Sequence, residues 1–342
     1  IYRTEVVFSP EEIDRAIYLA FEGIAGHFEV YFNGTQIVDS GAVMTGKKVL
    51  LSDYAVAGTN VIAILVFRYD RAAKGRVVKE LALHGLSGIL RPIKLVFEPL
   101  LEISNMRMKL SSVPSTYVDM NATKPSVRDE EQQLIISQDD DSYGEIYEAG
   151  EGARGATRET VSKVSRGNFI VDIDLEIVNH TDLMMPYSVR VSILEARGQY
   201  DPYKLPIIKL SQEKEISGVI DSKTSIMSEA QVIAANVAQW SDATPVQYDL
   251  VLELLDSDGN TICAKKRRFG FRTTEVILDK LNINERRVPL TITKYYEFDP
   301  DMGVSVPLER MRQDIILMKR CGINTIMVQA FPASTKLLNL CD

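Results

Sequence analysis

The sequence predicts a mainly β protein in which two β-sandwiches precede the beginning of an α/β domain. Short apolar or alternating runs, separated by Gly, Asn, Asp and Pro, fill residues 1–100 and return after residue 167. Evenly spaced short strands of this kind are typical of sandwiches. Residues 276–342 differ, because they hold apolar positions at helical spacing followed by a short apolar run.

The composition limits the classes of partner. The 342 residues are 45% hydrophobic and 25% charged, with a formal net charge of -8. An acidic chain with scattered Lys and Arg is poorly suited to a phosphate backbone, so we expect no nucleic-acid partner. No apolar run reaches the ~18 residues that would cross a bilayer, so we expect no membrane partner.

The cysteines and the first residues bear on the compartment. Cys263, Cys321 and Cys341 are odd in number and far apart, which favours free thiols in a reducing compartment over disulfides or a metal cluster. The start, IYRTEVVFSP, has neither the basic segment nor the apolar core of a secretion signal. We therefore expect a cytoplasmic protein. Because the chain has no initiator Met and opens inside a predicted strand, we also expect that an N-terminal piece is missing or was trimmed.

Residues 1–100 are expected to form the first sandwich. Phe28, Val30 and Phe32 alternate with polar neighbours, so they should lie on the buried face of one strand. Asn33-Gly34 follows directly, and this dipeptide tolerates positive φ, which predicts a two-residue hairpin. The strand-length runs are AIYLAFEGI, HFEVYFNGTQIV, KKVLLSDY, NVIAILVFRY and RPIKLVFEP.

Residues 101–275 are expected to form a second sandwich of immunoglobulin size, interrupted by a long mobile insertion at about 112–167. The insertion is polar and holds the acidic run Asp139 to Asp141, so it offers little apolar surface to bury, although Leu134 to Ile136 could form one short strand. Asp258-Gly259 predicts a further hairpin. One apolar face is expected from Phe169, Val171, Ile173, Leu175 and Ile177.

Residues 276–342 read as a strand, a helix and a buried strand in that order, the beginning of a βαβ unit. Ser305 is the expected N-cap, Pro307 lies in the first turn, and Gly322 is placed to end the helix. The chain stops where a second helix should be under way. The helical spacing is set by Met311, Ile315 and Met318.

Several segments resemble glycoside hydrolase family 2, and in particular its β-galactosidases. FEGIAGHFEVYFNGTQI and GLSGILRPIKLVFEP resemble strands of that family's sugar-binding jelly roll, and FGFR resembles the strand that leads into its barrel. EFDPDMGVSVPLERMRQDIILMKRCGINTI resembles the first barrel loop, helix and second strand, and is the most specific match. The resemblance implies a jelly-roll β-sandwich at 1–100, an immunoglobulin-like β-sandwich at 101–275, and the truncated start of a (β/α)8 barrel at 276–342.

The resemblance also implies where the chemistry lies. A retaining glycosidase needs two carboxylates about 5 Å apart, and in this family both are glutamates on later barrel strands. We therefore expect no catalytic residue in this chain, which alone should be inactive. Asn284-Glu285 is the Asn-Glu pair nearest to the barrel segment, and it precedes the first barrel strand, so we interpret it as a turn.

Candidate substrate contacts lie at the ends of the first two barrel strands, where barrel enzymes place their sites. Glu297 matches the family pattern, but Tyr296 stands where the family has His, Met327 where it has Arg, and Ala330 where it has a second His. These changes indicate either another substrate or a loss of catalysis. The residues that we expect to contact a carbohydrate are Tyr296, Glu297, Gln329 and Phe331.

No cofactor is expected, although a divalent or sodium ion is possible in the whole protein. Glu80 is a weak candidate metal ligand from the resemblance, since the pattern that surrounds such a ligand in the family is absent, and a solvated carboxylate is its alternative. His27 lacks companion ligands in the sequence and is interpreted as a structural histidine.

Two functions remain open on the sequence. In the first, the chain is the amino-terminal portion of a β-galactosidase-like hydrolase that cleaves terminal β-glycosidic bonds by retaining double displacement. In the second, it belongs to a non-catalytic carbohydrate-binding or scaffolding relative with a degenerate barrel. Two barrel strands leave unpaired edges, so we expect residues 276–342 to pack against the second sandwich or against another copy in a homo-oligomer.

Overall fold

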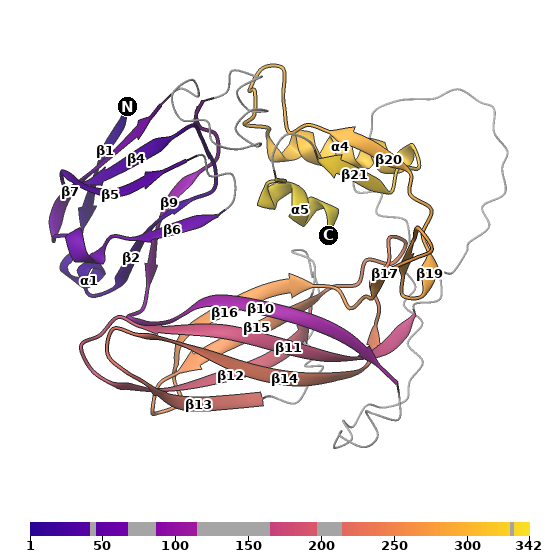
Figure 1. Cartoon of the computed structure of the whole chain (residues 1–342), viewed down its shortest axis with the longest axis horizontal. Coiled ribbons are helices and arrows are strands. Elements are labelled where there is room, and N and C mark those ends of the chain that lie inside the picture. The colour runs from indigo at the N-terminus through magenta and orange to yellow at the C-terminus, as the bar shows by residue number, and fades with distance from the viewer. Residues whose placement is uncertain (42–45, 68–86, 115–164, 197–213, 329–331) are drawn as a thin grey trace, which may run out of the picture.

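The computed structural model has three consecutive parts that are distinct in Figure 1. Two of them are built from strands, and the third, near the C-terminus, holds helices and a short parallel sheet. No helix in the described ranges is long and apolar enough to cross a membrane. The structure describes residues 1–41, 46–67, 87–114, 165–196, 214–328 and 332–342.

The first sandwich packs two antiparallel sheets and a short strand pair around one core. One sheet has the order β1 (Tyr2–Phe8), β7 (Gly58–Val66), β4 (Phe28–Phe32) and β5 (Thr35–Ser40). The other has the order β6 (Lys47–Leu50), β2 (Ala16–Phe21) and β9 (Ile93–Glu98), and β3 (Ile24–Ala25) pairs with β8 (Gly88–Ile89). Two short helices, α1 (Pro10–Ile13) and η1 (Ser52–Tyr54), connect these strands.

The predictions for this sandwich are confirmed at its centre. Phe28, Val30 and Phe32 are fully buried between the sheets. Asn33 and Gly34 join β4 to β5 with φ values of 50° and 85°, so both adopt the left-handed conformation that this hairpin requires. The Asn33 side chain also accepts a hydrogen bond from the Val61 backbone at 2.8 Å, which ties the turn to β7.

The second sandwich packs three strands against four. One sheet has the order β10 (Leu101–Val113), β11 (Arg166–Asn179) and β14 (Ser225–Ala238). The other has the order β13 (Lys214–Ile220), β12 (Met185–Glu195), β15 (Tyr248–Leu255) and β16 (Thr261–Phe269). This is the arrangement of an immunoglobulin-like sandwich. Every member of the expected apolar face is buried, namely Phe169, Val171, Ile173, Leu175 and Ile177.

Two features of the second sandwich differ from the expectation. The Asp258-Gly259 hairpin exists, but its loop is longer than two residues, since β15 ends at Leu255 and β16 begins at Thr261. The Asp256 side chain holds this loop by accepting the backbone N–H groups of Asp258 at 2.9 Å and Asn260 at 2.8 Å. Strand β14 was not expected, since Met227 and its other exposed apolar residues break the alternation. The proposed insertion core at 115–164, with its acidic run and its short strand, lies outside the described residues.

The C-terminal segment begins with a three-stranded antiparallel sheet and continues as the expected βαβ unit. Strand β20 pairs in parallel with β21, and α4 connects them. A last helix, α5, follows β21. The elements are β17 (Thr274–Ile277), β18 (Lys280–Ile283), β19 (Arg286–Arg287), β20 (Ile292–Tyr295), α4 (Leu308–Arg320), β21 (Thr325–Val328) and α5 (Thr335–Cys341).

The sequence predicted the C-terminal end of α4 correctly but not its N-terminal end. The expected N-cap, Ser305, is wrong: the helix begins after Pro307, whose side chain can make no capping bond, and Ser305 is held in the preceding turn. Gly322 does end the helix, with φ of 74°. Its N–H bonds to the Lys319 carbonyl at 2.9 Å, and the Ile323 N–H bonds to the Met318 carbonyl at 3.0 Å, which together form a Schellman motif.

One side of the β20–β21 pair is packed and the other is open. Tyr295, Ile326 and Val328 face the small core formed with α4 and α5. On the opposite side, which we call the open face, Ile292 is 48% exposed and Met327 is 45% exposed. The expectation of a fully buried second strand is therefore wrong, because only one layer of helices covers this two-stranded sheet.

Candidate functional site

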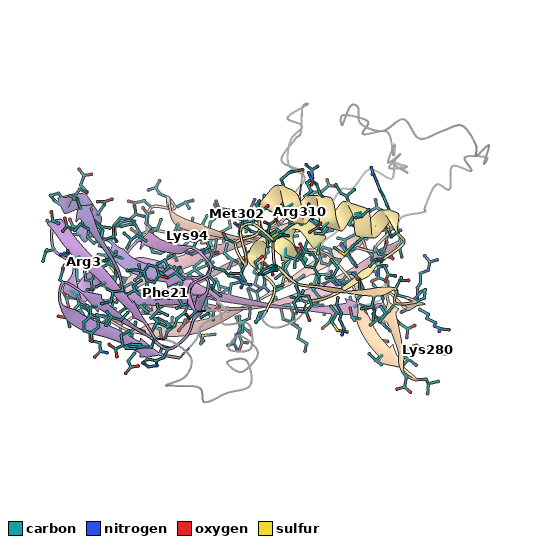
Figure 2. All side chains as sticks on the ribbon, turned by 90° about the horizontal axis from the view of Figure 1, so that it is seen from above. Arg3, Phe21, Lys94, Lys280, Met302 and Arg310 are labelled. Atoms are coloured by element: carbon teal, nitrogen blue, oxygen red, sulfur yellow. The ribbon has the colours of Figure 1, made fainter. Side chains whose placement is uncertain are left out.

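The ends of β20 and β21 form the candidate site, since parallel strands bring their carboxyl ends to one edge. Tyr296 and Glu297 follow β20 directly, and Pro332 follows β21 after three residues that lie outside the description. The loop between β20 and α4 reaches from this edge toward the first sandwich, as the position of Met302 in Figure 2 shows.

Arg91 of the first sandwich joins the two strand ends. It lies between β8 and β9, and its Nη2 donates to the Pro332 carbonyl oxygen at 2.7 Å. The same nitrogen lies 3.7 Å from Glu297 Oε1, which accepts the Ser334 N–H at 2.7 Å. We call this arrangement of Arg91, Glu297 and the backbone of Pro332 and Ser334 the strand-end clamp.

The clamp is a buried ion pair with additional hydrogen bonds. Glu297 is 4% exposed as a whole residue, and only 12% of the Arg91 side chain is exposed. Such a pair is stable when its remaining donors and acceptors are satisfied, and removal of one partner leaves an uncompensated buried charge. The clamp therefore fixes the strand-end loops to the first sandwich. Glu297 is buried and makes its contacts with Arg91 and the Ser334 backbone rather than with solvent.

Gly23 sets the direction of the Arg91 side chain. The backbone N–H groups of Leu90 and Arg91 both donate to the Gly23 carbonyl at 3.0 Å. A Cβ atom at Gly23 would lie 2.9 Å from Cδ of Arg91, closer than a packed side chain allows. The glycine thus lets the arginine stem lie flat on the neighbouring strand end.

Tyr295 supports the site from inside the C-terminal core. Its hydroxyl donates to Oδ2 of Asp314 on α4 at 3.2 Å, and Asp314 in turn lies 3.5 Å from Nε of Arg310. Burial raises the pKa of Tyr295, and the charge of Asp314 raises it further. The phenol therefore stays protonated and holds α4 against the end of β20.

The expected substrate contacts occupy different environments. Tyr296 is 48% exposed, so part of its ring is accessible to a sugar at the strand ends. Glu297 instead lies inside the clamp. Gln329 and Phe331, and also Glu80, lie outside the described residues. Sequence reasoning missed Arg91 as a partner of this site, and no periodicity could have indicated a contact across such a distance in the chain.

A second buried polar cluster lies where the two sandwiches meet. The Tyr18 hydroxyl of β2 donates to Glu102 Oε1 of β10, and His180 Nε2 lies 3.1 Å from the same oxygen. Burial alone would raise the pKa of Glu102, but the hydrogen bonds from His180 and Tyr18 outweigh it and lower the pKa. The buried carboxylate thus joins the first sandwich to the second.

Two other places have some features of a binding site. A shallow depression of about 290 Å³ lies between the second sandwich and β18–β19, lined by turn residues that include Ser241 and Asn284. None of its lining residues belongs to the strand-end clamp, and the Asn284 side chain donates a hydrogen bond of 2.9 Å to the Trp240 carbonyl. Within the described ranges, one group of side chains has the composition of a metal site, on the first sandwich.

Comparison with protein families assigns all three parts. Residues 1–99 match the sugar binding domain of the glycosyl hydrolases family 2, residues 157–272 match the domain described as glycosyl hydrolases family 2, and residues 274–342 match the family's TIM barrel domain. The order of the three matches along the chain is the order of the two sandwiches and the βαβ segment in the structure.

Individual relatives agree with this assignment. The β-galactosidase of Pseudoalteromonas haloplanktis is 24% identical over 341 residues, which are 100% of this chain and 27% of that protein. The β-galactosidase of Streptococcus thermophilus is 24% identical over 331 residues, 96% of this chain and 25% of that protein. The chain thus spans about a quarter of the length of these curated relatives.

Solved structures share the fold. The Bacteroides uniformis β-glucuronidase superposes with a TM-score of 0.72 at 14% identity, covering 100% of this chain and 34% of that one. The β-galacturonidase of Eisenbergiella tayi superposes with a TM-score of 0.66 at 17% identity, covering 99% of this chain and 48% of that one. With three successive family matches on the matching fold, this chain belongs to glycosyl hydrolase family 2.

Proposed function

We propose that the chain is the amino-terminal part of a β-galactosidase-like hydrolase that cleaves terminal β-glycosidic bonds with retention. Its sandwiches and first barrel strands support an active site whose acid and nucleophile come from polypeptide outside these 342 residues. The two curated relatives described above, which match 100% and 96% of this chain, are β-galactosidases. The chain itself is proposed to be inactive.

The open face is the observation that carries this proposal. In a (β/α)8 barrel, helices cover the outside of the strands and side chains from further strands fill the inside. Here α4 and α5 cover one side of β20–β21, while Ile292 and Met327 on the other side remain exposed. The sheet is therefore arranged to receive further strands on that side, with Tyr296 at the edge where such enzymes bind substrate.

Activity of the whole protein tests the proposal. The full-length protein should hydrolyse 4-nitrophenyl β-D-galactopyranoside, and NMR of the first-formed sugar should show the β anomer. The 342-residue chain, purified in the same way, is the matched control and should show no turnover. Hydrolysis by the 342-residue chain alone would overturn the assignment of catalysis to polypeptide outside it, and inversion at the anomeric carbon would overturn the mechanism.

The substrate class can be tested in the same assay. Solved relatives include enzymes named for glucuronic and galacturonic acids, so the corresponding β-glycosides serve as competitors. A preference for the neutral galactoside supports the proposal, whereas a preference of about tenfold or more for an acidic sugar would replace it. Tyr296→Ala should raise KM more than it lowers kcat if the exposed ring stacks on the sugar.

A non-catalytic relative is the second candidate. Met327 favours it, because this exposed residue stands where the resemblance places an arginine and offers no hydrogen bond to a sugar hydroxyl. Such a protein would bind a β-galactoside, as measured by calorimetry, without releasing any 4-nitrophenol. Turnover above the buffer rate, abolished by a mechanism-based inhibitor of retaining glycosidases, would exclude this candidate.

A further inference from the structure

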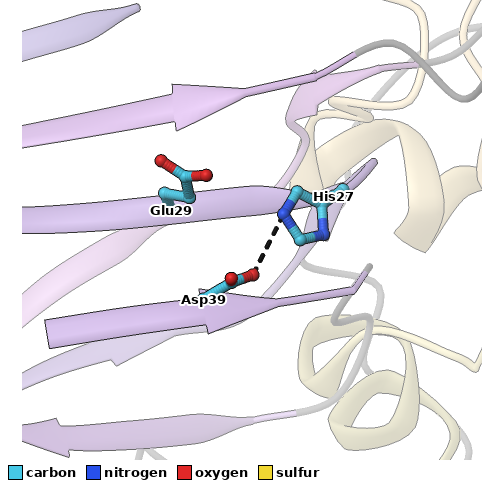
Figure 3. Close-up of side chains that lie close together, drawn as sticks. All are labelled: His27, Glu29 and Asp39. Atoms are coloured by element: carbon cyan, nitrogen blue, oxygen red, sulfur yellow. Dashed lines mark ion pairs between the residues drawn. The ribbon is translucent and has the colours of Figure 1, made fainter. Parts of the chain in front are cut away.

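Three potential metal ligands lie together on the outer face of the first sandwich (Figure 3). His27 precedes β4 directly, and Glu29 follows two residues later on that strand. Side chains two residues apart point to the same side of a strand. Asp39 of β5 pairs directly with Glu29 in the sheet register, so the neighbouring strand brings a third ligand to that side.

The distances suit a single ion. His27 Nε2 lies 3.0 Å from Asp39 Oδ1, and one ligand atom of each residue lies within 4.8 Å of the others. Ligand atoms that share a tetrahedral zinc ion are about 3.4 Å apart, given metal–ligand bonds of about 2.1 Å. The three ligand atoms therefore lie within about 1.5 Å of the spacing that one ion requires.

The local charge also favours a cation. Two carboxylates meet one imidazole, and among the described residues neither carboxylate forms an ion pair with a lysine or arginine. The Tyr31 hydroxyl donates to Glu29 Oε2 at 2.9 Å. Tyr31 thus orients one of the two carboxylates.

The backbone beneath these side chains is rigid. Strand β4 lies between β7 and β5, and Phe28 anchors it in the core. The His27 carbonyl accepts the Phe67 N–H at 2.8 Å, and the ring centroids of the two residues are 5.4 Å apart. Ligands on such a support lose little conformational entropy when an ion binds.

We propose that His27, Glu29 and Asp39 form a binding site for a divalent transition metal ion of the Zn²⁺ class, with water as the remaining ligand. An imidazole nitrogen with two carboxylate oxygens suits zinc rather than magnesium or calcium, which prefer oxygen ligands alone. The ligands come from β4, the residue before it and β5, so the role of the site is to cross-link these two strands.

Titration of the full 342-residue chain with Zn²⁺ alone tests the proposal after its thiols are blocked, because cysteines also bind zinc. One equivalent should bind, and His27→Gln and Asp39→Asn should each weaken binding by about tenfold or more. Glu5→Gln is the matched control, since it removes a carboxylate from β1 of the same sheet, and it should leave the affinity unchanged.

Cobalt provides a second readout. Co²⁺ at the site should give visible absorption bands of a four- or five-coordinate ion, which His27→Gln abolishes in a protein that circular dichroism shows to be folded. The proposal would be overturned if the thiol-blocked chain without substitutions bound no zinc at a free Zn²⁺ concentration about 100 times the micromolar dissociation constants expected of weak protein sites. Binding that persists unchanged in both His27→Gln and Asp39→Asn would overturn it equally.

Discussion

The second sandwich and the C-terminal segment differ in how far they bury their own apolar surface. In the second sandwich, two sheets face each other, and aromatic residues such as Phe169 and Phe271 are fully buried between them. In the C-terminal segment, a core centred on Met311 and Leu337 covers only one side of the β20–β21 pair. The open face remains exposed.

This difference shows that an apolar face can be covered either by its own segment or by another part of the protein. In a sandwich, both sheets come from one segment, so each buries the apolar face of the other. A βαβ unit covers its outer side with its own helix, but it needs further strands to cover the inner side. The C-terminal segment therefore depends on other parts of the protein for stability, and the strand-end clamp is one such dependence.

Deletion of a buried ring should show the largest effect. Phe169→Ala removes a fully buried side chain whose ring centroid lies 5.1 Å from that of Phe271, so the free energy of unfolding should fall by about 3–5 kcal/mol. The matched change in the C-terminal segment, Phe298→Ala, removes a residue that is 59% exposed and should alter it by less than about 0.5 kcal/mol. Urea unfolding followed by circular dichroism measures both, and equal effects would break the comparison.

Loss of the clamp should have the next largest effect, and it should be local. Arg91→Ala leaves the Glu297 carboxylate buried opposite no guanidinium, at a cost of about 2–4 kcal/mol to the docking of the strand ends. Hydrogen exchange should rise in residues 295–297 and 334–337 and not in β11. Arg3→Ala, at an exposed arginine of the same sandwich, is the control. Unchanged hydrogen exchange at the strand ends would show that the C-terminal segment is stable without the strand-end clamp.

The junction between the sandwiches should respond to pH. Because the folded pKa of Glu102 is lowered from its ordinary value of 4.5, the unfolded chain takes up the proton first as the pH falls. The stabilisation by Glu102 is therefore complete above about pH 5 and is lost as the pH falls through the lower folded pKa. Glu102→Gln should cost about 1–3 kcal/mol near neutral pH. Unfolding curves between about pH 6 and pH 3 should show this difference shrinking, and a constant difference would contradict the assigned hydrogen bonds.

The smallest effect concerns the end of α4. Gly322→Ala places a Cβ in the left-handed conformation and should cost about 1 kcal/mol. Lys319→Ala, three residues earlier on the exposed surface, should change stability by less than about 0.5 kcal/mol. Thermal unfolding of the two variants gives the comparison. A cost at Gly322 no larger than that at Lys319 would contradict the strain expected of a side chain in the left-handed conformation.

Local pattern accounts for what the sequence could predict. Alternation at Phe28 and Phe169 placed strands and their buried faces, and Asn33-Gly34 placed a hairpin, because strand and turn preferences act over a few residues. Strand β14 was missed, since its Met227 is exposed although apolar. Ser305 was expected to cap α4 on composition alone, but the cap position is set by where the backbone turns, which falls at Pro307.

The contacts that make up the site were beyond such reasoning. Residue type and resemblance placed Tyr296 and Glu297 at the end of a strand, but the pairing of Glu297 with Arg91 depends on how the first sandwich meets the C-terminal segment. For the same reason, the pairing of His27 with Asp39 could not be predicted. Its neighbour Asp39 is brought to it by the register of β4 and β5, which a single sequence does not state.

The separation of Arg91 and Pro332 has a consequence for biosynthesis. The two residues are 241 positions apart, and ribosomes add about 5–20 residues per second, so Pro332 is made about 12–48 s after Arg91. Small domains fold within that time. The first sandwich is therefore already in place as a template when the strand ends emerge, and errors in its folding would be passed on to the barrel.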